Sequence, residues 1–264
     1  MNLTDKTLVL TGASGGIGSA IAHAFAAQGC RLILAGRQRD KLAALQQALP
    51  GQQRNHQVIC CDLGTAAGRQ AWLDGCRGQG VSLLVKAAGV LDFRLVERQG
   101  SADVERILTT NLLAPMLLCQ SFIPLLKQSG EAAIVNIGSI YGSIGHPGFA
   151  TYCASKSGLK GFSEALRREL ADTGIKVYYL APRATATAFN PDRVTALNQE
   201  LGNSIDTTET VAKELLRLIR QNRPQSFMGW PEKLFVYVNA LFPGIVHNAL
   251  VKKLPVVKRH ADTD

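Results

Sequence analysis

The sequence predicts an α/β fold in which helices cover both faces of a central sheet. Short apolar runs of strand length alternate with segments whose apolar residues recur at helical spacing, which is typical of a doubly wound parallel sheet. The first run leads through a glycine-rich turn directly into a helix. With 264 residues, 46% of them hydrophobic, the chain suits one large domain, and no linker or repeat divides it.

Charge and cysteine content limit the class of protein. The net charge of +9 suits nucleic acid, an anionic membrane surface or an anionic ligand. No basic run is interleaved with aromatic residues, so we expect no nucleic-acid partner.

The six cysteines show neither a Cys-x-x-Cys pair nor metal-ligand spacing, which indicates reduced thiols, no metal site and a reducing, cytoplasmic compartment. No basic and then apolar leader precedes the first strand, so we expect no secretion signal.

The turn after the first strand predicts a phosphate site. Residues 8–10 form the strand, and Gly12, Gly16 and Gly18 then follow with the spacing Gly-x-x-x-Gly-x-Gly. Glycines let backbone N–H groups approach a ligand, and the N-terminus of the next helix attracts a negatively charged pyrophosphate. The pattern therefore favours a dinucleotide site over an ordinary glycine-rich turn.

The second strand, residues 31–35, ends at the position that meets the adenine ribose in dinucleotide folds. An acid there would bind the 2′-hydroxyl of NAD, whereas an arginine suits the 2′-phosphate of NADP. Arg37 stands there, with Arg39 close behind, so we favour NADP(H) over NAD(H). The alternative is that Arg37 is merely solvated. Asp40 is expected to be the N-cap of the following helix.

Five further apolar runs are expected to complete the sheet: residues 58–61, 83–85, 133–137, 176–180 and 225–228. Residues 102–127 form a helical stretch in which Pro115 and Pro124 should end or kink the helix. Asn111 lies within this stretch among apolar neighbours. A buried amide needs partners, so a structural role is one interpretation of this residue.

Tyr152 and Lys156 lie four residues apart on an expected helix, so their side chains emerge on one face. A free phenol titrates near pH ~10, and a cation beside it favours the phenolate and lowers its pKa. Such a pair can exchange a proton with a carbonyl or alcohol oxygen. Ser139 follows the fifth strand, at the carboxyl edge where ligands bind in such sheets.

Together these motifs make the sequence resemble a classical short-chain dehydrogenase/reductase over residues 5–230. The resemblance rests on the Thr-Gly-x-x-x-Gly-x-Gly turn, Asn111, Ser139, the Tyr-x-x-x-Lys pair and Pro182, all in the family's order. It implies a Rossmann-like, doubly wound sheet of seven mostly parallel strands in three α/β/α layers, with a short helical C-terminal extension. Residues 1–230 would be the catalytic domain and residues 231–264 its extension.

The resemblance also implies the chemistry. Tyr152 would be the general acid in reduction and the base in oxidation. Lys156 would bind the nicotinamide ribose and lower the pKa of Tyr152. Ser139 would hydrogen-bond the substrate oxygen, and Asn111 would hold a water in the proton relay. The hydride would come from the nicotinamide.

The cofactor contacts are implied in the same way. Asp62 would meet the adenine amine, Ala88 and Gly89 the adenine-side ribose, and Thr187 the carboxamide. The full implied set is Gly12, Ser14, Gly16, Ile17, Gly18, Arg37, Asp62, Leu63, Ala88, Gly89, Tyr152, Lys156, Pro182 and Thr187.

Two positions depart from the family pattern. The family usually has Asn-Asn-Ala-Gly where this chain has Lys86 and then Ala-Ala-Gly, which puts the hydrogen bonds at the end of the fourth strand in doubt. The family usually has Pro-Gly after the sixth strand, where this chain has Pro182 and Arg183. Arg183 either points to solvent or, as our hypothesis has it, contacts a cofactor phosphate or an acidic substrate.

The last third of the chain is less regular. Residues 185–203 are polar and rich in turn formers, and in the family this region is a flap over the substrate. His146 lies in the opposite loop, where a histidine is more often a loop residue than an acid or base. After an amphipathic helix at residues 207–221, residues 234–246 are apolar but interrupted by proline and glycine, and a basic end follows. This extension could pack against a subunit or domain, or contact a membrane peripherally.

We therefore expect an NADP(H)-dependent oxidoreductase that interconverts a carbonyl and an alcohol by hydride transfer, as a reductase on a hydrophobic substrate. The alternative is a catalytically inactive NADP-binding regulator or scaffold with the same fold. The family is often dimeric or tetrameric, so a homodimer or homotetramer is expected.

Overall fold

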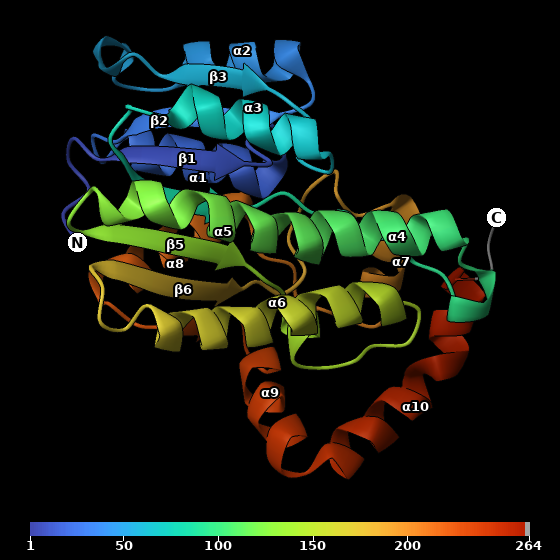
Figure 1. The fold of residues 1–264 in the computed structure, drawn as a ribbon. Coiled ribbons are helices and arrows are strands. Elements are labelled where there is room, and N and C mark those ends of the chain that lie inside the picture. Colours follow the sequence, from blue (N-terminus) through green and yellow to red (C-terminus); the bar gives the residue numbers. More distant parts are fainter. Residues whose placement is uncertain (262–264) are drawn as a thin grey trace.

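A computed structural model describes residues 1–261 as a parallel sheet with helices on both faces (Figure 1). The strands lie in the order β3-β2-β1-β4-β5-β6-β7. They are β1 (Thr7–Thr11), β2 (Arg31–Gly36), β3 (Gln57–Cys60), β4 (Val81–Lys86), β5 (Ala132–Ile137), β6 (Ile175–Ala181) and β7 (Gln225–Phe227). Every pairing between them is parallel, which confirms the predicted doubly wound fold.

The helices fill the connections between the strands. They are α1 (Gly16–Ala26), α2 (Arg39–Ala48), α3 (Ala66–Cys76), α4 (Ser101–Leu108), α5 (Ala114–Lys127), α6 (Ala150–Glu169), α7 (Asp192–Glu200), α8 (Thr208–Arg220), α9 (Glu232–Leu241) and α10 (Pro243–Ala261). The chain winds from β1 towards β3 and then returns to β4 on the other side of β1. This reversal between β1 and β4 is where ligands bind in open α/β sheets.

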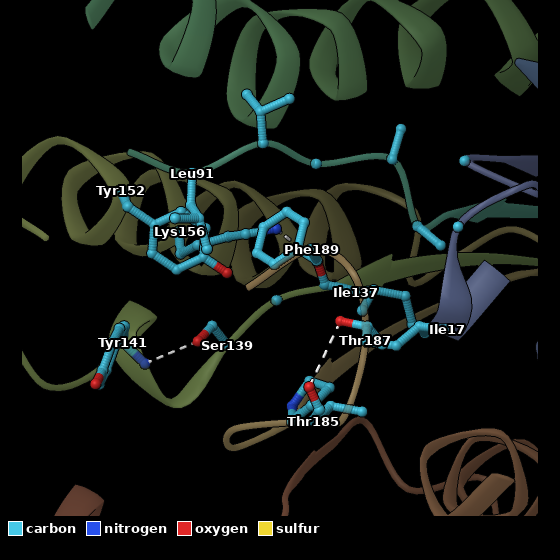
Figure 2. Close-up of a pocket in the computed structure, with 18 of the residues that line it drawn as sticks. Ile17, Leu91, Ile137, Ser139, Tyr141, Tyr152, Lys156, Thr185, Thr187 and Phe189 are labelled. Carbon is cyan, nitrogen blue, oxygen red and sulfur yellow. Dashed lines mark hydrogen bonds between the residues drawn. The ribbon is translucent and has the colours of Figure 1, made fainter. Parts of the chain in front are cut away.

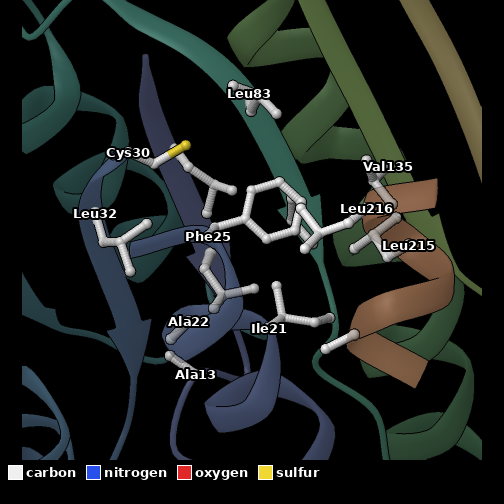
Figure 3. Close-up of a cluster of buried hydrophobic side chains, with 14 of the residues drawn as sticks. Ala13, Ile21, Ala22, Phe25, Cys30, Leu32, Leu83, Val135, Leu215 and Leu216 are labelled. Atoms are coloured by element: carbon white, nitrogen blue, oxygen red, sulfur yellow. The ribbon is translucent and has the colours of Figure 1, made fainter. Parts of the chain in front are cut away.

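One face of the sheet is covered by α1, α2 and α8. Phe25 of α1 lies at the centre of this layer and packs with Ile21 and with Leu215 and Leu216 of α8 (Figure 3). Burying a side chain of this kind stabilises the fold by about 1.5–3 kcal/mol. Because helices cover both faces, the central strands are apolar on both sides, and β1 is buried along its whole length.

The other face is covered by α3, α5 and α6. Trp72 of α3 and Phe122 of α5 lie at its centre, with ring centroids 4.9 Å apart. The two layers hold the sheet rigidly, so the strand ends form a fixed platform for the site.

The stretch from Ser101 to Lys127 is a continuous helix, not a broken one. A turn of π-helix, Thr109–Leu113, joins α4 to α5 and contains Asn111. Pro115 lies in the first turn of α5, and Pro124 lies inside α5 without ending it. By length and composition alone this helix could cross a membrane. Its α5 part packs on β4 and β5, as the core helix of a globular domain does.

Two expected details were wrong. Gln38, not Asp40, is the N-cap of α2, and Asp40 lies in its first turn, where a negative charge still suits the helix dipole. The flap at residues 185–203 is not wholly irregular, because α7 forms within it. Val194 and Leu197 of α7 are buried against the aromatic side chains near Tyr152, and this packing outweighs the polar composition.

The C-terminal extension forms two helices, α9 and α10, that meet at a sharp corner and project away from the sheet (Figure 1). Their inner sides pack on the body: Val236 and Val246 join a cluster with Tyr179 and Phe227. At the far end of α10, Val257 joins the cluster that contains Tyr152. The extension is therefore part of the structure that surrounds the site.

Candidate active site

A pocket of about 710 Å³ lies at the carboxyl edge of the sheet, where β1, β2, β4, β5 and β6 end. Its volume is typical of a cofactor site. Every residue predicted to bind cofactor or to act in catalysis lines it, with the exception of Asn111. The sequence prediction therefore identified the residues that the fold brings together here.

The turn between β1 and α1 is tightly packed. Gly12 has φ +66°, and a Cβ added there would lie 2.6 Å from the backbone of Ala88. A Cβ added at Gly18 would lie 2.0 Å from the Gly12 carbonyl oxygen. Gly12 is thus required both for its left-handed backbone conformation and for the close approach of Ala88. Gly18 is required because a side chain there would collide with the backbone of Gly12.

The start of α1 offers backbone donors to a ligand. The first N–H groups of a helix, here from Gly16, have no partner within the helix. The N-cap Gly15 supplies no side-chain cap, and the first turn carries no acidic residue that would repel an anion. This donor set fits the pyrophosphate of a nicotinamide dinucleotide.

The end of the pocket beside β2 and β3 carries cations and one turn-forming acid. Arg37 and Lys41 both line it, whereas Arg39 does not. The carboxylate of Asp62 accepts a hydrogen bond from the Gly64 N–H at 2.9 Å, which fixes the turn after β3. Lys41 was not anticipated from the sequence; its place three residues after Gln38, in the first turn of α2, could have indicated it.

Tyr152 and Lys156 emerge from α6 into the pocket on the same face, as the spacing predicts. The Lys156 Nζ lies 5.7 Å from the centre of the Tyr152 ring and donates to the Ile137 carbonyl at 3.1 Å. The Tyr152 hydroxyl points into the pocket on the side of Ser139 (Figure 2). Ser139 Oγ in turn accepts a hydrogen bond from the Tyr141 N–H at 3.1 Å, so this hydroxyl has a fixed position.

Burial governs the protonation of this pair. It raises the pKa of Tyr152, and the side-chain hydrogen bond with Ser139 only partly opposes this effect. It also lowers the pKa of Lys156 to about 8. The net shift of the Tyr152 pKa is opposite to the one expected from its lysine neighbour, because loss of solvent is the largest cause and only the hydrogen bond with Ser139 acts against it.

The buried lysine predicts a particular pH dependence of stability. The Lys156 pKa is about 8 in the folded protein and 10.5 for a solvated lysine, so burial of the charge weakens the fold below pH 8. That penalty, about 3 kcal/mol, lifts as the pH rises towards 10.5. Lys156→Met removes this penalty but also removes the hydrogen bond to the Ile137 carbonyl, which stabilises the fold by about 1 kcal/mol. We therefore expect the free energy of unfolding of the cofactor-free protein at neutral pH to rise by about 2 kcal/mol. Urea denaturation across this pH range measures it.

Lys160→Met is the matched control, because Lys160 is a partly exposed lysine one turn further along α6 and pairs with Glu164 at 3.2 Å. The control should leave the pH profile unchanged. If the free energy of unfolding of Lys156→Met rose with pH as steeply as that of the wild type, the buried charge of Lys156 would not be the cause of the pH dependence.

Asn111 acts on the backbone beside the site. Its Oδ1 accepts from the Val90 N–H at 2.9 Å, and its Nδ2 donates to the Val90 carbonyl at 2.8 Å and to Ser155 Oγ at 3.1 Å. Both amide hydrogens are therefore used. A relay water at Asn111 would have to bind an oxygen of this residue, not the amide nitrogen.

Lys86 resolves the doubt about the end of β4. Its side chain turns away from the strand end into the α5 layer, where Nζ donates to the Pro115 carbonyl at 3.2 Å and to the Cys119 sulfur. Burial lowers its pKa. The strand end itself is held by the backbone of Ala88, which donates to Thr11 Oγ1 at 3.2 Å.

Arg183 does not simply point to solvent, so that interpretation was wrong. Its side chain lines the pocket, and contact with a cofactor phosphate or an acidic substrate stays a prediction. Its guanidinium pairs with Asp206 at 2.8 Å and with Glu232 at 3.2 Å, and it also donates to the Trp230 carbonyl. Its side chain is 16% exposed. Arg183 thus ties the end of β6 to the first turn of α9.

We expect Arg183→Met to lower the free energy of unfolding by about 2 kcal/mol, because two largely buried carboxylates lose their partner. If Arg183 serves only its two ion pairs, the dissociation constant of the cofactor should stay within about twofold. A larger loss of affinity would show that this pocket-lining arginine also contacts the cofactor. Thermal unfolding and isothermal titration measure the two quantities. Arg217→Met is the control, because Arg217 of α8 is exposed and its partner Glu214 keeps a second ion pair with Arg223. It should change stability by less than about 1 kcal/mol.

Several residues that line the pocket were not assigned to the site from the sequence, and His146 was interpreted there as a loop residue. The centre of the ring of Phe189, in the flap, lies 6.3 Å from the centre of the Tyr152 ring, and both side chains line the pocket (Figure 2). His146 is buried, stacks on Tyr141 at 5.0 Å and donates through Nδ1 to the Pro147 carbonyl. No pattern marks Phe189. Four residues of α10 also line the pocket at helical spacing, which could have been detected: Val246, Ala249, Leu250 and Lys253.

Comparisons with known proteins bear on this geometry. The family model described as short chain dehydrogenase matches residues 6–198. The chain belongs to the short-chain dehydrogenase/reductase family. It is 36% identical to a 3-oxoacyl-(acyl-carrier-protein) reductase of Rickettsia prowazekii, over 69% of this chain and 73% of that protein. It is 37% identical to carbonyl reductase family member 4 of Danio rerio, over 67% and 75%.

Solved structures agree with the assignment. A short-chain dehydrogenase/reductase of Burkholderia phymatum in complex with NAD has a TM-score of 0.82 at 22% identity, over 93% of this chain and 96% of that one, and shows the fold. A structure named as an NAD(P)-dependent gluconate 5-dehydrogenase of Beutenbergia cavernae, with bound NADP, has a TM-score of 0.76 at 27% identity, over 86% and 95%. This short-chain dehydrogenase/reductase is thus an oxidoreductase of CH–OH or carbonyl groups. The family match ends before α9 and α10.

Proposed function

We propose that this chain is an NADPH-dependent reductase that converts a hydrophobic ketone or aldehyde into an alcohol, and that it also runs the reverse reaction. The observation that carries the proposal is the meeting of two parts in one pocket. One part is the glycine turn at the start of α1, and the other is the Tyr152 phenol with Lys156 and Ser139 beside it. Reduction of a carbonyl needs a hydride donor and a proton donor side by side.

The proton comes from this chain. NADPH, when bound, supplies the hydride to the carbonyl carbon. Tyr152, whose raised pKa keeps it protonated at neutral pH, donates its hydroxyl proton to the carbonyl oxygen, and the product is the alcohol. Ser139 donates a hydrogen bond to the same oxygen as its negative charge develops. Lys156 binds the ribose hydroxyls and stabilises the phenolate that remains. Asn111 keeps the backbone at Val90 in position.

We assign the cofactor contacts by the resemblance. Gly12, Gly16 and Gly18 hold the pyrophosphate with Ser14 and Ile17; Asp62, Leu63, Ala88 and Gly89 hold the adenosine; Pro182 and Thr187 hold the nicotinamide. Residues 1–230 make up the catalytic domain and residues 231–264 its extension.

The preference for NADP(H) is proposed from Arg37. This arginine lines the pocket beyond the end of β2, with Lys41 nearby, and the two cations suit a 2′-phosphate. We expect Arg37→Ala to raise the Michaelis constant for NADPH by about 10–100-fold while that for NADH changes little. Arg39→Ala, which removes an exposed arginine outside the pocket, is the control. Equal effects on the two cofactors would remove the preference.

The hydrophobic substrate is proposed from the walls of the inner pocket. Phe149, Phe189, Val194, Val246 and Leu250 surround the space in front of Tyr152. The test is oxidation of NADPH with a series of aldehydes of increasing chain length. kcat/KM should rise with chain length, and turnover with none of them would leave only a cofactor-binding protein.

The assembly and the cellular place are also proposals. We propose a homodimer or homotetramer in the cytoplasm, in peripheral contact with a membrane through α9 and α10. Light scattering coupled to size exclusion measures the first of these, and a monomer would contradict it.

A further inference from the structure

Exposed apolar side chains concentrate on the C-terminal extension. Of the fourteen large hydrophobic residues that are exposed within residues 1–261, eight lie between Trp230 and Val251. The most exposed are Leu241 at 72%, Trp230 at 66%, Phe242 at 60% and Ile245 at 58%. Such a concentration marks an interaction surface, because single exposed apolar residues are normally scattered.

Leu241, Phe242 and Ile245 lie at a corner that the fold holds outward. Leu241 ends α9, Phe242 is the link, and Ile245 lies in the first turn of α10 (Figure 1). The start of α9 is fixed by the ion pair between Glu232 and Arg183. The end of α10 is fixed where Arg259 and His260 contact Glu200 of α7. The corner, which we call the α9–α10 corner (residues 241–245), is therefore presented by two anchored helices.

The charge of α9 and α10 indicates which kind of partner the corner binds. Within residues 231–261 the cations are Lys233, Lys252, Lys253, Lys258 and Arg259, and the acid is Glu232, which is paired with Arg183. Lys252 lies seven residues after Ile245, on the same side of α10, and both are exposed. A symmetric contact between two copies would set this basic surface against itself, which is unfavourable. An anionic lipid surface complements both the charge and the apolar corner.

A groove beside the corner leads towards the catalytic pocket. It has a volume of about 420 Å³ and lies between α9, α10 and the loop at residues 145–147. Val246 and Leu250 line both this groove and the pocket that contains Tyr152. The groove and the pocket therefore share a wall that these two side chains of α10 form.

We propose that the α9–α10 corner inserts into the interface of an anionic membrane, and that the adjoining groove passes a membrane-dissolved carbonyl compound to Tyr152. The membrane contact stands on the corner and the charge alone. The route to the pocket rests also on the proposed reductase function. The substrate class is accordingly an aldehyde or ketone with a long alkyl chain, taken from the bilayer and not from water.

Binding is tested by sedimentation of the full chain with vesicles of phosphatidylcholine, with and without phosphatidylglycerol. The wild type should pellet with the anionic vesicles and be released by high salt. The affinity of the double variant Leu241→Ser/Phe242→Ser for anionic vesicles should be lower than that of the wild type by at least about tenfold. Lys252→Glu should lose binding to anionic vesicles. Val96→Ser, which removes a side chain that is 65% exposed elsewhere, is the matched control. Equal pelleting of the double variant and the wild type overturns the proposal, as does a double variant that changes only the oligomeric state.

Delivery is tested with two substrates. The double variant should reduce butanal in solution as fast as the wild type, because residues 241 and 242 do not line the pocket. It should reduce hexadecanal in anionic vesicles about tenfold more slowly. Equal rates on hexadecanal would overturn the route. Vesicle binding without turnover of either aldehyde would contradict the proposed reductase function and would still support the membrane contact.

Discussion

Tyr152→Phe should lower kcat/KM for carbonyl reduction by about a thousandfold while the affinity for NADPH remains within about twofold. The substitution removes one oxygen, which is the proposed proton donor to the carbonyl. It leaves the ring in its buried cluster with Phe149 and Val257. It also leaves untouched the glycine turn that we propose binds the pyrophosphate of the cofactor. Initial rates of NADPH oxidation measure kcat/KM, and isothermal titration calorimetry measures the affinity for NADPH.

Tyr178→Phe is the matched control, because it removes another largely buried phenol of the same sheet, whose hydroxyl donates to Asn222. It should reduce carbonyls at the wild-type rate. If Tyr152→Phe retained more than about a tenth of the activity, another group would have to supply the proton. His146, whose ring lines the same pocket, would then be examined first.

Gly18→Ala should abolish measurable binding of NADPH. The added Cβ would lie 2.0 Å from the Gly12 carbonyl oxygen and 3.0 Å from the Ala13 Cα, so the turn between β1 and α1 must open. These are backbone atoms, which cannot rotate away as a side chain does. The backbone donors at the start of α1 would then no longer converge on one phosphate. We expect an affinity loss of more than about a hundredfold, measured by titration, with a lower melting temperature.

Gly161→Ala provides the comparison. Gly161 lies on the exposed side of α6, and a Cβ there meets nothing within 4 Å. Alanine in a helix is favoured over glycine by about 0.5–1 kcal/mol, so this variant should melt higher and bind NADPH normally. A Gly18→Ala protein that binds NADPH as tightly as Gly161→Ala would show that the close contact of this turn is not needed.

Part of the site could be predicted because its signals are local in the sequence. The glycine turn is a short segment between one strand and one helix, and Tyr152 and Lys156 share one helical face through their spacing alone. The alternation of strands and helices predicted the parallel sheet. A parallel sheet in turn brings the carboxyl ends of its strands to one edge, so residues far apart in the chain were expected to meet there.

Other features depend on partners that no local pattern names. Arg183 follows β6 and could face solvent, cofactor or acid; only the folded chain brings Asp206 and Glu232 to it. Lys86 was equally ambiguous until α5 placed Pro115 and Cys119 above β4. The direction of the pKa shift at Tyr152 belongs here as well, since burial is a property of the whole packing.

By itself, the sequence determined the doubly wound fold, the dinucleotide turn and the Tyr152–Lys156 pair, because periodicity and spacing act over a few residues. The tertiary structure alone decided which charges pair, which pocket walls come from α7 and α10, and that the α9–α10 corner stays exposed. These depend on contacts between segments distant in the chain, and the free energy of such contacts is set by burial and by the partner that arrives, which composition does not specify.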